Sequence, residues 1–338
     1  MKVGVGISGG VDSAVAAMLL KSAGHEVVGY TMCLGRVGEG KALSEAKSVA
    51  DWLGIRLFAI DCSEEWRDRV CAYLRNTYLA GQTPNPCVRC NETVKFGVLP
   101  KLAFADGCER FATGHYSRLD TDASGRVFLR RGADRKKDQS YFLYRVSRET
   151  LSRTLFPLGG MTKAEVRQMA HDAGFAVAEK SDSQDFCGGD PMEIVGAEDR
   201  VGNIVDTSGK ILGQHNGFWH FTPGKRKGLG VGGGTPYYVV RLDAERNEVI
   251  VAFKEASIVR EFRLSDEVWL ADADYVRTVQ ENGGLFVKVR SAGEPKGPVS
   301  FDGHVVKCAN GLIGVAPGQS AVFYDGDTVL GGGLISAT

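Results

Sequence analysis

The chain has 338 residues, more than one typical hydrophobic core holds, which predicts two or three domains. Lys and Arg together number 41, as do Asp and Glu, so the formal charge is zero and any nucleic-acid surface must come from local clusters. No stretch approaches the length of an uncharged apolar membrane span, and the start MKVGVGISGG lacks the features of a signal peptide. We therefore expect a cytoplasmic protein.

The first half of the chain alternates short apolar runs with segments of helical periodicity. The predicted strands are Lys2–Ile7, Val27–Met32, Ile55–Ile60 and Arg110–Thr113, and the predicted helices are Ala14–Ala23, Lys41–Leu53, Glu64–Leu79 and Thr162–Ala173. Thr162 is the expected N-cap of the last helix, with Glu165 completing a capping box. This βαβα order predicts an α/β fold, a parallel sheet with helices on both faces.

After about Gly202 the chain changes to short alternating runs separated by turn residues. The runs are Tyr237–Leu242, Glu248–Ala252, Glu267–Leu270, Leu285–Arg290, Gly297–Phe301, Leu312–Val315 and Ala321–Tyr324. Such spacing is typical of β-rich modules, and we expect small barrel-like domains here.

The segment SGGVDS, Ser8–Ser13, lies between the first predicted strand and helix. Its glycines allow a close backbone approach to an anion, and a helix N-terminus directs free N–H groups and a positive dipole toward it. Asp12 is unexpected in a plain anion site and indicates a Mg²⁺ ligand or a structural cap. No GK[ST] follows, so this is not a Walker loop, and the competing interpretation is a simple capped turn.

Eight cysteines are present, and in a reducing compartment clustered cysteines are more often metal ligands or catalysts than disulfides. Cys87 and Cys90 form a CxxC pair in TPNPCVRCN, where two prolines disfavour helix, so we expect both on an exposed loop. Cys187 follows much later in SQDFC. A half zinc site, a redox dithiol and chance all remain open for the pair alone. We interpret the other five as core or incidental residues: Cys33, Cys62, Cys71, Cys108 and Cys308.

Three further features have both a functional and a structural interpretation. His115 follows a predicted strand end and could bind nucleotide or cap a loop. The basic runs, Arg130 to Lys137 and Lys225–Lys227, could be phosphate contacts or solvated surface. His215 and His220 lie in β-type sequence and are expected to be structural.

SGGVDS resembles the signature of the PP-loop ATP pyrophosphatases, which cleave ATP between the α and β phosphates. The motifs NPxxxCN, ATGHYSR, KDQSYFLY, SQDFC, GQHxG, KRKGLG and GQSAVFYDGDxxLGGG follow in an order and spacing similar to the tRNA-specific 2-thiouridylase family (MnmA). The matches run from Ser8 to about Gly333. The resemblance implies a PP-loop catalytic domain at 1–200, with a helical tRNA-binding segment around 150–200, a central β domain at 201–262 and a C-terminal β-barrel at 263–338.

The resemblance also implies roles for individual residues. Cys90 and Cys187 match the two catalytic cysteines, the second carrying a persulfide, and Asp12 serves the ATP step with Mg²⁺. The ATP-contacting positions are Gly6, Ile7, Ser8, Gly9, Gly10, Val11, Asp12, Ser13, Met32 and Gly114. The positions that meet the target base are Asn85, Pro86 and Cys87, and the other tRNA contacts are Lys137, Asp138, Gln139 and Arg290.

One departure from the family pattern has a chemical consequence. The family usually has Asp where this chain has Cys87, and a thiolate binds iron or zinc better than a carboxylate does. Cys87, Cys90 and Cys187 could hold three irons of a [4Fe–4S] cluster and leave one iron open for the transferred sulfur.

The sequence therefore predicts ATP-dependent 2-thiolation of the wobble uridine (U34) of tRNA, through adenylation of the base and sulfur transfer from a persulfide or a cluster. The expected partners are tRNA and a sulfur donor, either a cysteine desulfurase or a sulfur-carrier protein. The alternatives are a PP-loop ligase or sulfurtransferase with another substrate, and a zinc-bound RNA-binding module. The intact SGGVDS loop disfavours the last.

Overall fold

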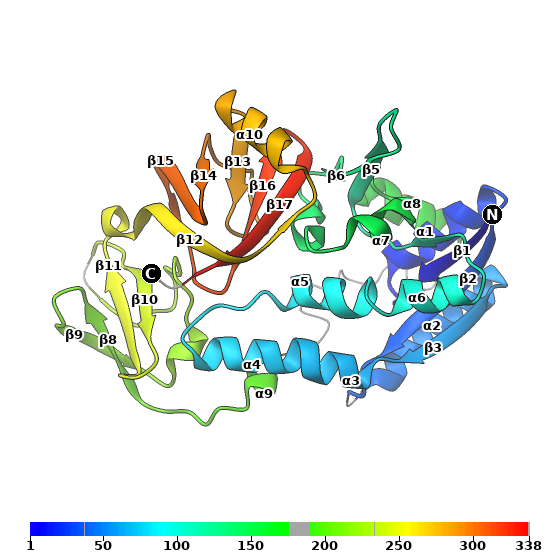
Figure 1. Ribbon diagram of the computed structural model, residues 1–338. Helices are drawn as coiled ribbons and strands as arrows, with labels where there is room; N and C mark the ends of the chain where they lie inside the picture. The colour runs from blue at the N-terminus through cyan, green and yellow to red at the C-terminus, as the bar shows by residue number, and fades with distance from the viewer. Residues whose placement is uncertain (37, 176–189, 233, 337–338) are drawn as a thin grey trace. The chain divides into compact units, whose positions relative to one another are not determined.

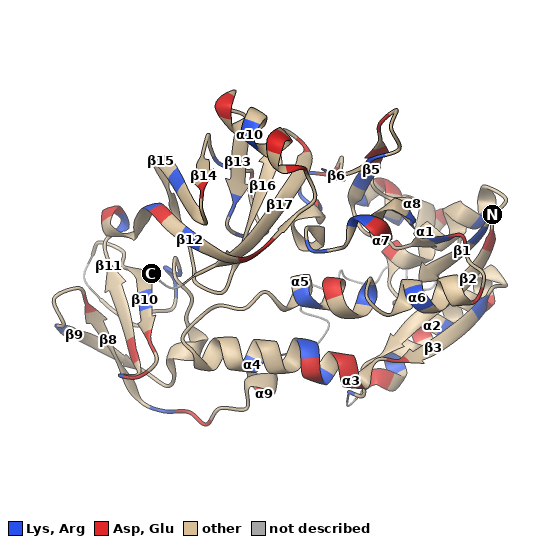
Figure 2. Ribbon diagram, viewed as in Figure 1, with Lys and Arg blue, Asp and Glu red and all other residues tan. Residues whose placement is uncertain are grey.

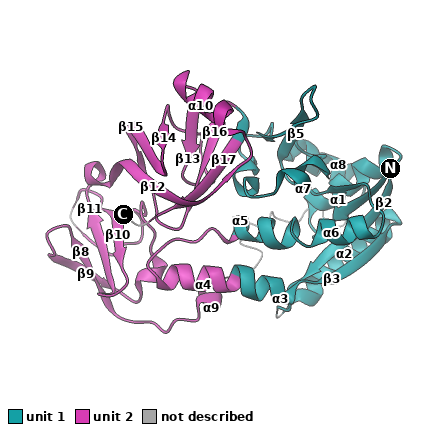
Figure 3. Ribbon diagram, in the orientation of Figure 1, with its two compact units in different colours: residues 1–70, 87–189, 327–329 teal, residues 71–86, 190–326, 330–338 magenta. Residues whose placement is uncertain are grey.

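The computed structural model describes residues 1–36, 38–175, 190–232 and 234–336. The chain forms two compact units, shown in Figure 3. The first, called the nucleotide unit below, contains residues 1–70, 87–189 and 327–329. The second, called the β unit, contains residues 71–86, 190–326 and 330–338. The division falls inside the TPNPCVRCN segment, between residues 86 and 87.

The nucleotide unit is built on a five-stranded sheet in the order β3-β2-β1-β4-β7 (Figure 1). All of its neighbouring strands are parallel. Its strands are β1 (Lys2–Gly6), β2 (Glu26–Cys33), β3 (Arg56–Asp61), β4 (Arg110–Ala112) and β7 (Thr154–Leu155). The predicted α/β class is confirmed.

Helices cover both faces of this sheet because successive side chains of a strand point to opposite sides. Val3 and Val5 of β1 pack into one core with α1 (Val11–Ser22), α2 (Glu39–Leu53) and α8 (Lys163–Asp172). Gly4, between them, faces α6 (Leu99–Ala105), where a Cβ atom would lie 2.8 Å from the Ala103 Cβ. The capping box predicted at Thr162 and Glu165 is present at the start of α8.

The remaining elements of the nucleotide unit are short. They are α3 (Ser63–Glu65), α5 (Pro86–Cys90), a π-helical turn (Asn91–Lys95), the β5–β6 hairpin (Ser117–Thr121 and Val127–Arg131), a 3₁₀ turn (Ser140–Leu143) and α7 (Arg148–Ser152). The predicted helix Glu64–Leu79 is divided into α3, a π-helical segment (Trp66–Cys71) and α4 (Ala72–Leu79).

The expectation that Cys87 and Cys90 lie on an exposed loop was wrong. They lie in α5, and Cys90 is buried with 2% of its surface exposed. Pro86 is the first residue of α5, a position where the missing N–H group removes no helical hydrogen bond. The proline therefore begins the helix instead of preventing it.

The β unit contains two antiparallel-rich sheets, as the turn-separated runs predicted. The first has the order β10-β11-β8-β9 and packs on Phe218, Trp219 and Phe221. Its elements are α4, α9 (Pro191–Val195), β8 (Gly202–Asp206), β9 (Ile211–His215), a 3₁₀ turn (Phe218–His220), β10 (Tyr238–Asp243), β11 (Glu248–Ala252) and a second 3₁₀ turn (Lys254–Ser257).

The second sheet of the β unit turns a corner at one long strand, β12 (Ile258–Trp269). Its first half pairs with β15 and its second half with β17, and each half has a register shift. Such irregularities bend a strand from one sheet into another, as small barrels require. The other elements are α10 (Ala273–Glu281), β13 (Leu285–Lys288), β14 (Ser300–Asp302), β15 (Val305–Ile313), β16 (Ser320–Asp325) and β17 (Thr328–Ile335). No helix among the described residues is long and apolar enough to span a membrane.

Candidate active site

The loop Ser8–Ser13 joins the end of β1 to the start of α1, as predicted. Ser13 closes the loop: its hydroxyl accepts a hydrogen bond from the Ser8 N–H at 3.1 Å and donates to the Gly10 carbonyl at 3.0 Å. Gly10 is the N-cap of α1 and offers no side-chain acceptor to the first-turn N–H groups. These N–H groups and the helix dipole together suit an anion.

Glycine is required at two positions around this loop. Gly9 has φ +73°, and a Cβ atom there would lie 2.7 Å from the Glu45 Cβ. A Cβ atom on Gly114, which follows β4, would lie 2.7 Å from the Asp12 carbonyl carbon and 2.8 Å from the Ser13 nitrogen. Gly114 is therefore packed against the backbone of the loop, and its contact with a nucleotide stays a prediction.

The other predicted ATP positions are at the same end of the sheet. Ile7 and Val11 are buried, so they can offer only backbone groups to a ligand, whereas Ser8 is exposed. Gly6 ends β1, and the half-buried Met32 lies near the end of the adjacent β2. These residues follow the carboxyl ends of parallel strands, where open α/β sheets bind their ligands.

Asp12 is held by two residues that sequence reasoning did not single out. Lys163 Nζ lies 2.7 and 2.9 Å from its two carboxylate oxygens, and the Tyr116 hydroxyl donates a hydrogen bond to Oδ1 at 2.8 Å. Lys163 and Tyr116 are 151 and 104 residues away along the chain, so no local pattern could have indicated the contact.

Cys87 and Cys90 are three residues apart on α5, a spacing that places two side chains on one face of a helix. Cys90 is buried and Cys87 is half-buried. The third predicted member of the group, Cys187, lies outside the described residues. In the described part of the chain, no three His, Cys, Asp or Glu side chains are arranged to hold a metal ion.

An ion-pair cluster fixes the helical turn that carries Cys90. Glu92 Oε2 lies 2.8 Å from Arg89 Nη1 and 2.9 Å from Arg145 Nε. The Arg145 side chain is only 5% exposed, so this charge is largely withdrawn from water. The Asn91 amide also donates to the Phe142 carbonyl at 3.2 Å. The CxxC motif and the KDQSYFLY motif therefore meet in the folded nucleotide unit.

The residues before Cys87 are bound within the β unit by the GQSAVFYDGD motif. The Thr83 N–H donates to the Pro317 carbonyl at 2.7 Å, and the Gln319 amide donates to the Pro84 carbonyl at 3.0 Å. The Asn85 N–H donates to the Tyr73 hydroxyl at 3.1 Å. Asn85 is buried and Pro86 is half-buried, so this contact fixes the backbone of the predicted base-binding segment.

The predicted tRNA contacts differ in exposure. Asp138 is buried, with Oδ2 3.1 Å from Arg131 Nε and Oδ1 accepting from the Gly132 and Ser140 N–H groups. These contacts hold the turn in shape. Lys137 and Gln139 are half-buried, and Arg290 is exposed. Lys225–Lys227 is an exposed run in the β unit. Figure 2 shows charges of both signs interspersed along both units.

The other histidine and cysteine candidates described here are packed or hydrogen-bonded within the fold. His115 is buried, its Nδ1 lies 2.7 Å from the Thr113 hydroxyl, and it packs against Phe96 and Phe156. Burial, with a smaller effect of Lys95, lowers the pKa of His115 well below its usual value, so the ring is neutral. Burial raises the pKa of Cys62 to about 12, which makes it an inert core thiol. The structural role expected for His215 is confirmed, because its Nδ1 accepts the Gly217 N–H.

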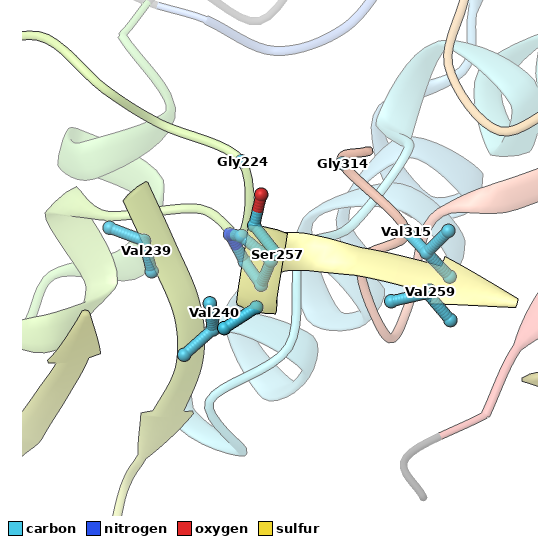
Figure 4. Close-up of a pocket in the computed structure, with 9 residues that line it drawn as sticks. Gly224, Val239, Val240, Ser257, Val259, Gly314 and Val315 are labelled. Atoms are coloured by element: carbon cyan, nitrogen blue, oxygen red, sulfur yellow. The ribbon is translucent and has the colours of Figure 1, made fainter. Parts of the chain in front are cut away.

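A small pocket lies within the β unit, and Figure 4 shows it between β10, β12 and the residues that follow β15. Its volume of about 50 Å³ and its lining by Val239, Val240, Val259 and Val315 leave room for a water molecule or two. It is too small for a nucleotide or a base.

Three family models match successive parts of the chain. The tRNA methyl transferase HUP domain matches residues 1–188, the tRNA methyl transferase PRC-barrel domain residues 194–253, and the aminomethyltransferase beta-barrel domain residues 259–335. Curated relatives match over nearly the whole chain. The tRNA-specific 2-thiouridylase MnmA of Endomicrobium trichonymphae is 42% identical over 99% of this chain and 99% of its own length.

Two further relatives carry the same name. The protein of Trichormus variabilis is 42% identical over 99% of this chain and 98% of its own length. The protein of Rhizorhabdus wittichii is 42% identical over 100% of this chain and 92% of its own length. The strand order, the loop and the helix N-terminus define an α/β protein with an anion-suited loop after its first strand and appended β modules. The chain belongs to the tRNA-specific 2-thiouridylase family, which confirms the resemblance found in its motifs.

Proposed function

We propose that this protein is an ATP-dependent tRNA-uridine 2-sulfurtransferase that acts on the wobble uridine in the cytoplasm. The observation that carries the proposal is identity of 42% with tRNA-specific 2-thiouridylases over essentially the full length of both chains. Family membership confirms the predicted class of activity, 2-thiolation of uridine in tRNA. The anion-binding loop at the end of β1 supports the ATP step.

The nucleotide phosphates bind at Ser8–Ser13, where the N–H groups of the first turn of α1 face an incoming anion. Asp12 is the loop residue whose carboxylate suits Mg²⁺. Lys163 contacts both oxygens of Asp12, so a bound Mg²⁺ would share this carboxylate with the ammonium group. Bound Mg²⁺ supplies charge neutralisation for the departing pyrophosphate.

The proposed reaction begins with adenylation of the base and continues with sulfur transfer and reduction of the enzyme. The uridine C2 oxygen attacks the α-phosphate of ATP, the bond to the β-phosphate breaks, and pyrophosphate leaves. The terminal sulfur of a Cys187 persulfide then attacks C2 and AMP leaves with the former carbonyl oxygen. The Cys90 thiolate attacks the inner sulfur of Cys187, which breaks the S–S bond, leaves sulfur on C2 and forms a Cys90–Cys187 disulfide. An external thiol reduces that disulfide before the next turnover.

The substrate tRNA meets two groups of residues in this proposal. The segment Asn85–Cys87 lies against the target base, which is flipped out of the stack so that C2 can be reached. Lys137, Gln139 and Arg290 contact the tRNA, with Asp138 holding the turn in shape. A cysteine desulfurase or a sulfur-carrier protein charges Cys187.

Substitution of either proposed sulfur-transfer cysteine tests this assignment. We expect Cys90→Ser and Cys187→Ser each to abolish 2-thiouridine while tRNA binding is retained, because a hydroxyl provides no equivalent thiolate chemistry. Cys308→Ser, a change at a buried cysteine of the β unit, is the matched control. The measurement is nucleoside mass spectrometry of tRNA from a complemented deletion strain. Normal 2-thiouridine in either variant removes that residue from the mechanism.

As an alternative to the persulfide route, we propose that Cys87, Cys90 and Cys187 hold a [4Fe–4S] cluster that delivers the sulfur. Cys87 and Cys90 fit two thiolate ligands because their spacing places them on one face of α5. When bound, such a cluster offers an open iron that can carry sulfur. The chain's own contribution is the packing of α5 and the Glu92 ion pairs, which hold Cys90 in place.

Iron and sulfide analysis of anaerobically purified protein tests the cluster. We expect a brown protein with absorbance near about 400 nm, an expectation from cluster chemistry in general. Cys87→Ala should lose iron and activity together, whereas Cys71→Ala, at a half-buried cysteine of the π-helical segment, should keep both. An iron-free protein that thiolates tRNA from a persulfide donor at full rate contradicts the cluster and leaves the persulfide route.

A further inference from the structure

Asp12 adds a negative charge to a loop that binds polyphosphate, and without a counter-charge this carboxylate repels the ligand. The structure compensates it with the Lys163 ammonium group, 2.7 and 2.9 Å from its two oxygens, and with the Tyr116 hydroxyl. The Lys163 side chain is 11% exposed, so its charge is largely withdrawn from water and faces the carboxylate. The Lys163 ammonium offsets the charge of Asp12, and the two donors together restrict the orientation of the carboxylate.

Both donors are also attached to one surface turn, residues 134–139, called the basic turn below because it contains Arg135, Lys136 and Lys137. The first connection runs through α8. The Lys163 N–H donates to Asp134 Oδ2 at 3.0 Å, while the Lys136 N–H donates to the other oxygen of Asp134. Asp134 therefore joins the basic turn to the helix end that carries Lys163.

The second connection runs through Tyr116. The Gln139 N–H donates to the Tyr116 carbonyl at 3.0 Å, and the Tyr116 N–H donates to Gln139 Oε1 at 2.9 Å. The backbone of Tyr116 is thus paired in both directions with the last residue of the basic turn, while its hydroxyl holds Asp12. The two connections are independent, and both end on the same carboxylate.

The residues around Tyr116 and the basic turn are closely packed, so these two hydrogen-bonded connections have little room to move. A Cβ atom on Gly132 would lie 2.5 Å from the Tyr116 carbonyl oxygen, and one on Gly159 would lie 2.0 Å from the Ser117 carbonyl oxygen. The buried Asp138–Arg131 ion pair fixes the base of the basic turn. In so close-packed a region, a shift of the turn is transmitted to its neighbours.

We propose that Tyr116 and Lys163 are positioning residues for Asp12, and that through them RNA bound at the basic turn is energetically coupled to nucleotide bound at the loop. The inference rests on the proposed function, since it takes tRNA as the occupant of the basic turn. Its consequence is that tRNA orders the loop for ATP, so that the nucleotide binds weakly until tRNA is present. By reciprocity, ATP raises the affinity for tRNA by the same factor.

The test is a set of dissociation constants for α,β-methylene-ATP, which cannot be cleaved at the reacting bond, measured with and without unmodified tRNA. We expect tRNA to raise the affinity of the unsubstituted protein by about fivefold or more, the lower end of typical couplings. In Tyr116→Phe the factor should fall by about twofold or more, because only the Lys163 connection then remains, with the affinity for tRNA alone retained. Tyr30→Phe is the matched control, because that buried hydroxyl also donates to an aspartate, Asp106, at 2.8 Å.

A second comparison separates charge compensation from a structural role. Lys163→Met leaves Asp12 with the Tyr116 hydrogen bond but without a counter-charge and should weaken nucleotide binding by about tenfold or more, since an uncompensated carboxylate then faces the phosphates. In the Asp12→Asn background the same Lys163→Met change should have an effect of less than about threefold. A purely structural lysine would give the same loss in both backgrounds, with a matching fall in melting temperature.

The result that overturns the inference is a coupling factor of one in the unsubstituted protein, or an undiminished factor in Tyr116→Phe. Nucleoside mass spectrometry of tRNA modified by the same preparation distinguishes this failure from failure of the proposed function. If 2-thiouridine forms without coupling, only the inference is wrong. If no 2-thiouridine forms, the proposed function is wrong.

Discussion

Gly114 packs against the backbone of the loop Ser8–Ser13, which leaves no room for a side chain at this position. Replacing it with Ala puts a Cβ atom within 2.8 Å of backbone atoms of Asp12 and Ser13. We expect Gly114→Ala to destabilise the protein by about 1–3 kcal/mol and to weaken binding of α,β-methylene-ATP, since the start of α1 must move. Calorimetric binding and thermal melting measure both effects.

Gly160→Ala is the control for that experiment. No atom lies within 4 Å of a Cβ atom added at Gly160, so the same chemical change meets open space in the same unit. Equal effects of the two substitutions would mean that contact with the loop is not what requires glycine at position 114.

At this scale the sequence predicted the loop but not the residues that complete it. SGGVDS indicated an anion site because all of its parts are adjacent in the chain. Asp12 remained ambiguous between a metal ligand and a cap. Its partners Lys163 and Tyr116 come from α8 and from the residue before β5, and only the folded sheet brings them to α1. His115 is adjacent to Tyr116 but points into an aromatic core.

At the scale of elements, the positions of α5 and of the π-helical turn after it depend on the ion pairs of Glu92. Glu92→Gln leaves the arginine side chains of Arg89 and Arg145 without their carboxylate, and that of Arg145 is nearly inaccessible to water. We expect a loss of about 1–3 kcal/mol in the free energy of unfolding and faster alkylation of Cys90, because α5 is no longer tied down. Urea unfolding and mass-spectrometric labelling of Cys90 measure these changes.

The control for Glu92 is an exposed ion pair of the same kind. Glu261 lies 3.6 Å from Lys307, with both side chains more than half exposed, so Glu261→Gln should change stability by less than about 1 kcal/mol. An unchanged Cys90 alkylation rate in Glu92→Gln would show that the cluster does not position the cysteine.

The sequence predicted elements well where the local signal was complete. The capping box at Thr162 and the short apolar run of β11 are examples. The prediction of a loop at α5 was wrong. It treated both prolines as helix breakers, although proline is also favoured at the first position of a helix. The sequence-based prediction missed β17, whose run of three glycines has no strand pattern and whose burial comes from its neighbours in the sheet. It also missed α10, although Asp272 at the N-cap position was an available signal.

Because the net charge of the whole molecule is zero, the electrostatic attraction for tRNA must come from local clusters of basic residues. We expect log affinity to fall with log salt, and removal of Lys137, Arg290 or one residue of Lys225–Lys227 to reduce the slope by about 0.7–0.9 each. Filter binding across a range of potassium chloride concentrations measures the slope. Lys307→Ala, a substitution of an exposed lysine already paired with Glu261, is the control. A flat response would show that the basic runs are solvated surface.

The central claim is that ATP cleavage and sulfur insertion into tRNA are one coupled reaction. The most direct measurement is the ratio of AMP formed to 2-thiouridine formed, with purified protein, unmodified tRNA, a persulfide donor and excess thiol. The account predicts one AMP and one pyrophosphate for each 2-thiouridine, with no product when ATP is omitted. Release of AMP and pyrophosphate with no sulfur in the tRNA, or 2-thiouridine formed without ATP, would contradict it.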